Sequence, residues 1–131
     1  LQPEAPLPVI VEAPPFRAVL IAESTASPEW KASVSSWLVK SGCLYFLAWG
    51  RDCEAWHDCV DHANIDQCGP GEIPDGEFVM TTWHSDDPLE EVFWFAKNNA
   101  DHPTVDLERL LLVHISPEPN ETEFLRAYSD A

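Results

Sequence analysis

Short, almost continuous hydrophobic runs alternate along this chain with segments in which hydrophobic positions recur every three or four residues. The runs predict strands at residues 16–22, 43–49, 78–83 and 110–115. Because they lack a strict alternation of polar and apolar positions, they are typical of strands in a parallel sheet that is covered on both faces. The segments between them carry hydrophobic residues on one face only, which predicts three connecting helices.

Residues that commonly begin helices stand at the expected places. Ser27 precedes the first predicted helix and Asp52 precedes the second, each as an N-cap. The third helix has the clearest signal, since Asp87 is predicted to cap it, Pro88 to take the first position and Glu90 to complete a capping box. Strands and helices are therefore expected to alternate as β-α-β-α-β-α-β.

This order of elements predicts an α/β domain with three layers, in which helices cover both faces of a mostly parallel four-strand sheet. The commonest arrangement of this kind has the strand order 2-1-3-4, which we expect here, with the first strand between the second and the third. We expect a Pro-rich arm at residues 1–15, the α/β domain at 16–116 and a tail at 117–131 that includes one short helix. The arm is either a linker or a segment packed along the domain.

The chain is strongly acidic. Among 131 residues, 23 are Asp or Glu and only seven are Lys or Arg, so the formal net charge is −16. Nucleic acids and anionic membranes are therefore excluded as expected partners, because phosphate contacts need clustered cations. The charge favours a basic protein partner or bound cations, or serves only solubility. No apolar run approaches the length of a membrane span, and we expect a cytoplasmic protein.

The cysteines are expected to be reduced and to bind no metal. They are Cys43, Cys53, Cys59 and Cys68. Cys53 and His57 share one face of the second predicted helix, whereas Cys59 and His62 lie on another. Four ligands cannot converge on one ion from opposite sides of a helix, so we predict neither a metal site nor a cofactor.

Any catalytic or ligand-binding site is expected at the carboxyl ends of the strands, where α/β sheets bind ligands. The candidate catalytic residues there are Glu23, Ser24 and His84. The candidate ligand-binding residues are Arg51, Asp52, Trp83 and Asp86. If the function lies there, Glu23 and His84 are expected to face each other, with His84 as the proton donor or acceptor for an anionic ligand and Glu23 holding it in orientation. The alternative is that the aspartates only cap helices and that Glu23 is a solvated turn residue.

Several catalytic classes lack their motifs. The chain contains no Gly-x-Gly-x-x-Gly, no Gly-Lys-Ser/Thr loop and no Gly-x-Ser-x-Gly elbow. Exposed aromatics are a positive signal instead, because Trp94 lies off the apolar face of the third helix and next to Phe95. The tail, the arm or a partner must cover this run; we expect the tail to do so, and we take Trp94 and Phe95 as the candidate interface.

Two segments carry a resemblance to a known family. They are AWGRDCEAWHDCVDHAN at residues 48–64 and TTWHSDDPLEEVFWFAK at residues 81–97. Both resemble a small uncharacterised bacterial α/β domain family, over about residues 16–116. The resemblance implies no activity.

The preferred hypothesis is a non-catalytic acidic module that binds a basic protein partner, as an inhibitor, immunity protein or regulatory subunit does. The alternative is a small enzyme or anionic-ligand-binding domain that uses the crevice at the ends of strands one to three.

Overall fold

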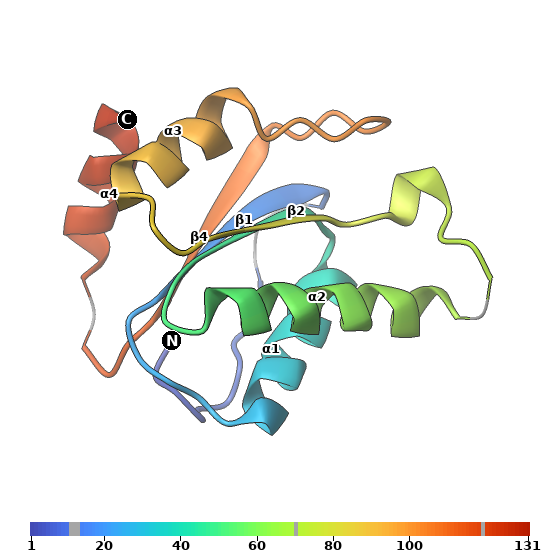
Figure 1. Cartoon of the computed structure of the whole chain (residues 1–131), viewed down its shortest axis with the longest axis horizontal. Coiled ribbons are helices and arrows are strands. Elements are labelled where there is room, and N and C mark those ends of the chain that lie inside the picture. The colour runs from blue at the N-terminus through green and yellow to red at the C-terminus, as the bar shows by residue number, and fades with distance from the viewer. Residues whose placement is uncertain (11–13, 70, 119) are drawn as a thin grey trace.

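The computed structural model describes residues 1–10, 14–69, 71–118 and 120–131, and in them strands and helices alternate (Figure 1). The elements are β1 (Phe16–Ala22), α1 (Pro28–Ser41), β2 (Cys43–Gly50), α2 (Cys53–Cys68), the 3-10 turn η1 (Asp75–Glu77), β3 (Met80–His84), α3 (Leu89–Asn98), β4 (Arg109–Ile115) and α4 (Glu121–Asp130). All strand pairs are parallel. The predicted α/β class is confirmed.

The order of the strands is β3-β2-β1-β4, so the predicted order 2-1-3-4 is wrong. The first strand lies between β2 and β4 rather than beside β3. The composition of β3 gives a physical reason: it carries Thr81, Thr82 and a half-exposed Trp83, which suit an edge that stays partly solvated. The apolar β1 and β2 fill the centre, where both faces are covered.

Two apolar cores lie on opposite faces of the sheet, with α1 and α2 on one side and α3 and α4 on the other (Figure 1). Alternate residues of β1 serve them in turn. Leu20 and Ala22 belong to the core beneath α1 and α2, whereas Val19 and Ile21 belong to the core beneath α3 and α4. This alternation is the pleat of a strand that is buried on both faces.

The Pro-rich arm packs along the domain over residues 1–10, while residues 11–13 lie outside the described part of the chain. Two tryptophans of α1 hold it through indole N–H groups. Trp30 donates to the Ala5 carbonyl at 2.9 Å, and Trp37 donates to the Pro8 carbonyl at 2.7 Å. The arm is therefore packed along the domain over these residues and is not a free linker.

The helix caps agree only in part with the prediction. Ser27 caps α1 as predicted, with its hydroxyl accepting the backbone N–H of Trp30 at 3.1 Å. Asp52 precedes α2 but makes no capping hydrogen bond; its carboxylate pairs with Lys31 at 3.2 Å instead. The predicted capping box of α3 is not formed. The helix begins one residue later than predicted, at Leu89, and its first turn has no side-chain cap.

The tail forms α4, which packs on α3. Tyr128 meets Phe93 edge to face with ring centroids 5.7 Å apart, and Lys97 donates to the Tyr128 carbonyl at 2.8 Å. The tail nevertheless leaves Trp94 51% exposed, so the prediction that it covers this side chain is wrong. Successive residues of a helix point about 100° apart, so a helix seated on Phe93 does not reach Trp94.

Candidate functional site

An open cleft of about 680 Å³ lies at the carboxyl ends of β1 and β2, where the sequence predicts a site. Glu23, Arg51 and Asp86 all line it, so three of the predicted residues share one cleft. At this cleft the segment that follows β2 lies close to the end of β1, because the backbone N–H of Arg51 donates to the Ala22 carbonyl at 2.8 Å. In the described part of the chain, no acceptor pairs with the Arg51 guanidinium.

The predicted pairing of Glu23 with His84 is wrong. Because β2 lies between β1 and β3, the ends of the strands that carry these residues are not neighbours. The ring of His84 is held elsewhere, with Nδ1 3.0 Å from the Asp87 carboxylate and Nε2 3.0 Å from the Thr82 hydroxyl. Among the described residues, Ser24 is not hydrogen-bonded to either ring nitrogen of His84.

Glu23 instead contacts a different histidine, His114 of β4. Its Oε1 lies within hydrogen-bonding distance of Nε2 of the imidazole. The neighbouring positions of β1 and β4 produce this pair, and the ring also meets Phe124 of α4 edge to face at 4.6 Å. A carboxylate beside an imidazole can hold or move a proton. Among the described residues, however, no serine hydroxyl or cysteine thiol is hydrogen-bonded to the pair to act as a nucleophile.

The other predicted ligand-binding residues lie outside the cleft. Asp52 is engaged with Lys31. Trp83 lies on the face of the sheet that α2 covers, where the centroid of its ring is 4.6 Å from that of His57. Its own neighbour in sequence, His84, points to the α3 side, because side chains of a strand alternate between its faces.

The candidate interface residues line a second hollow, of about 400 Å³, beside the end of β3. Trp94 and Phe95 come from α3, His84 comes from the strand, and the carboxylate-bearing Asp87 and Glu91 complete the lining. Phe95 is half-buried against His84, with ring centroids 5.8 Å apart, whereas Trp94 is 51% exposed. An exposed aromatic ring therefore stands next to two acidic side chains.

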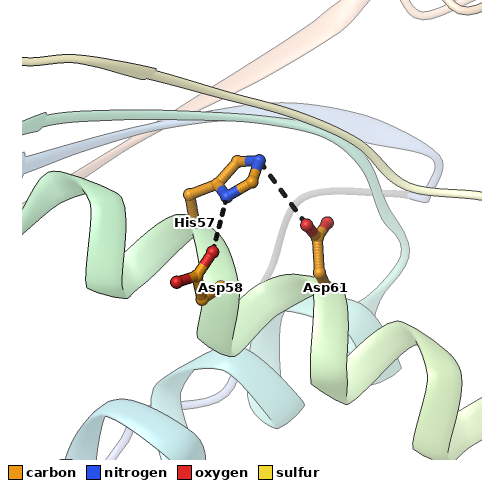
Figure 2. Close-up of side chains that lie close together, drawn as sticks. All are labelled: His57, Asp58 and Asp61. Carbon is orange, nitrogen blue, oxygen red and sulfur yellow. Dashed lines mark hydrogen bonds and ion pairs between the residues drawn. The ribbon is translucent and has the colours of Figure 1, made fainter.

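A third group of side chains lies on α2 and was not predicted from the sequence. His57, Asp58 and Asp61 bring one nitrogen and two carboxylate oxygens to within 4.8 Å of one another (Figure 2). The prediction that this helix binds no metal rested on its histidines and cysteines alone and left out its carboxylates. The spacing of His57 and Asp61, four residues apart on a helix, is the signal that would have found the pair.

Cys59 lies beside this group as a neutral thiol. Partial burial raises its pKa above the usual value, the Asp58 carboxylate raises it further, and the opposing effect of Lys31 is smaller than that of burial. Burial raises the pKa of Cys43 to about 12. Cys53 and Cys43 are buried in the core, and all four cysteines are free.

Comparison with known proteins assigns the family. A family described as a domain of unknown function (DUF7684) matches residues 1–131. The chain belongs to this family. The resemblance noted in the sequence is thereby confirmed as membership of an uncharacterised family, and it extends over the whole chain rather than over residues 16–116. Searches of the curated proteins and of the solved structures gave no match.

In the described part of the chain, no helix has the length and hydropathy needed to cross a membrane.

Proposed function

We propose that this DUF7684 domain is a non-catalytic interaction module that binds a basic protein partner through the surface around β3 and α3. The observation that carries the proposal is a pair of exposed tryptophans on this surface. Trp83 of β3 is 45% exposed and Trp94 of α3 is 51% exposed. They flank an edge strand, one on each face of the sheet. An inhibitor, an immunity protein or a regulatory subunit would use such a surface.

Tryptophans that stay exposed in the free protein are typical anchors of interfaces. A Trp side chain buries roughly 200 Å², so covering the exposed half at about 25 cal/mol per Å² contributes about 2.5 kcal/mol for each ring. Two such rings supply a large share of the free energy of a micromolar complex, which is about 8 kcal/mol.

Charge on this surface favours a basic partner. A Lys or Arg side chain that enters the hollow beside Trp94 would meet the carboxylates of Asp87 and Glu91 and the face of the indole ring. The module itself has few cations to compete, because it holds only seven Lys and Arg. Three of these, Arg17, Lys31 and Lys97, already bind groups within the domain.

The alternative function, an enzyme or anion-binding domain at the cleft, has weaker support. Glu23, Asp86 and Asp87 line that cleft together with a single cation, Arg51. Three carboxylates against one guanidinium disfavour an anionic ligand. The acid–base pair expected there is also not formed, since His84 binds Asp87 and Thr82.

Selection from a random peptide library on the immobilised full chain tests the proposal. We expect enriched peptides to contain Lys or Arg, and their association to slow markedly between 0.1 M and 1 M salt, because the Debye length falls from about 10 Å to about 3 Å. Trp94→Ala and Glu91→Gln should each weaken binding by roughly tenfold or more.

Leu125→Ala is the matched control, because this side chain of α4 is equally exposed, at 52%, and lies outside the proposed surface. If it weakens binding as much as Trp94→Ala, or if the enriched peptides are acidic, the proposal is wrong. Binding that requires Arg51 and is unaffected by Trp94→Ala would favour the cleft.

We further propose that the domain works in the cytoplasm, since Cys43, Cys53, Cys59 and Cys68 are free thiols. Alkylation of thiols in intact cells, followed by mass spectrometry, tests this. All four should be trapped as reduced cysteines after denaturation.

A further inference from the structure

On α2, one imidazole lies between two carboxylates (Figure 2). Nδ1 of His57 is 3.1 Å from Oδ1 of Asp58, and Nε2 is 3.5 Å from Oδ2 of Asp61. The imidazole side chain is only 16% exposed, whereas both carboxylates remain accessible to solvent. The opening of this cluster thus faces water on its acidic side.

The two contacts are chemically different. We assign the tautomer in which Nδ1–H donates to Asp58, the shorter contact at 3.1 Å, so that the lone pair of Nε2 faces an oxygen of Asp61. Two acceptors at 3.5 Å repel each other unless a cation lies between them. The separation fits two ligands of one ion, because bonds of about 2.1 Å at a tetrahedral angle put their ends about 3.4 Å apart.

Two residues of strand β3 hold the Asp61 carboxylate and the His57 imidazole in place. Thr81 donates its hydroxyl to Oδ1 of Asp61 at 2.7 Å, so that Oδ2 faces the imidazole. The ring of Trp83 covers the imidazole with centroids 4.6 Å apart. Ligands of metal ions are commonly oriented in this way by hydrogen bonds and packing from a second layer of residues. The arrangement is therefore built by two elements and is not a chance spacing on one helix.

We propose that Nε2 of His57 and the Asp61 carboxylate bind a divalent transition-metal ion, with Asp58 orienting the imidazole and water completing the coordination. A ligand set of imidazole and carboxylate suits ions such as Zn²⁺, Co²⁺ and Ni²⁺, whereas Mg²⁺ and Ca²⁺ prefer oxygen ligands alone. The net charge of −16 further favours a dication at this surface. The site borders the proposed interface, because the ring of Trp83 belongs to both, but the binding of a metal ion there does not rest on that proposal.

Titration of the chelator-treated full chain with Ni²⁺ tests the site by calorimetry and tryptophan fluorescence. We expect a saturable site that His57→Gln and Asp61→Asn each remove, and that Asp58→Ala weakens by roughly 10- to 100-fold. Ni²⁺ bound here should quench Trp83, the ring that covers His57. Trp83→Phe should therefore abolish that quenching while the heat of binding remains.

His62→Gln is the matched control, since His62 is an exposed histidine on the same helix and outside the cluster. It should bind Ni²⁺ as the unaltered chain does. If His57→Gln and Asp61→Asn also bind with unchanged stoichiometry, the proposal is overturned. The absence of saturable binding of both Ni²⁺ and Zn²⁺ would overturn it too, and would mean that a proton alone bridges Nε2 and the carboxylate. Circular dichroism confirms that each variant is folded; if His57→Gln is not, Asp61→Asn decides.

Discussion

Replacing Gly50 by Ala should destabilise the domain far more than the same change at Gly69. Gly50 ends β2 with φ +98°, a backbone conformation that side chains with a Cβ rarely adopt. A Cβ built on it would lie 2.2 Å from the carbonyl oxygen of Ala22 and 3.0 Å from the carbonyl carbon. Both are backbone atoms of β1, which is fixed between β2 and β4. Neither can move aside cheaply.

Gly69 measures the conformational part of this effect alone. Its φ is +74°, and a Cβ there would meet nothing within 4 Å. Gly69→Ala should therefore cost about 1–3 kcal/mol, the penalty of a positive-φ backbone region that is adopted almost only by glycine. Gly50→Ala should cost that amount, about 1 kcal/mol for weakening the Arg51 N–H···Ala22 hydrogen bond, and 1–3 kcal/mol for the clash. The expected sum is about 3 kcal/mol or more.

Urea denaturation followed by circular dichroism measures the difference directly. A loss of about 3 kcal/mol is a large part of a typical stability of 5–15 kcal/mol, so the midpoint should fall clearly. If Gly50→Ala is unfolded in buffer, the same titration in a stabilising osmolyte recovers the comparison. Equal losses at the two glycines would refute the reasoning, since they would show that the approach of β2 to Ala22 is not a constraint.

Three further changes test other parts of the fold. Burial raises the pKa of Cys43 from 9.0 to about 12, so between pH 9 and pH 12 this thiol ionises mainly in the unfolded chain. The free energy of unfolding of the unaltered protein should therefore fall by about 1.4 kcal/mol more than that of Cys43→Ala between pH 7 and pH 10. Equal losses in the two proteins would contradict the burial of this thiol. Ser27→Ala should lower the free energy of unfolding by about 1 kcal/mol because it removes the cap of α1, whereas Ser33→Ala, on the exposed side of the same helix, should change it little. Lys97→Met removes a donor to the last carbonyls of α4 and should speed hydrogen exchange in that helix by roughly fivefold; unchanged protection there would show that packing alone docks the tail.

Several features that depend on neighbours along the chain were predicted correctly, although the caps expected at Asp52 and Asp87 were not. The strand at residues 16–22 has the predicted bounds, because a run such as Val19-Leu20-Ile21 is stable only when both faces are buried. The cap at Ser27 was also predicted, since its hydroxyl and the N–H group three residues later are close neighbours along the chain. The parallel class followed from the alternation of strands and helices, because parallel strands need long crossovers.

The candidate site was predicted only where it depends on the strand ends. Glu23, Arg51 and Asp86 share a cleft because all parallel strands end on the same edge of the sheet. The histidine that contacts Glu23 belongs to the strand that lies beside β1. The hydrophobic pattern of a single segment does not indicate which strand that is. His114 was therefore overlooked as its partner in favour of His84.

The sequence by itself determined the kinds of elements, their bounds to within a few residues, the acidic charge and the spacing of His57 and Asp61 on one helix. Only the tertiary structure decided the strand order, the exposure of Trp94 and the contacts of β3 with the cluster on α2. The physical reason is range. Helix periodicity, caps and burial patterns come from interactions over a few residues, whereas the order of strands is set by the packing of segments that lie tens of residues apart.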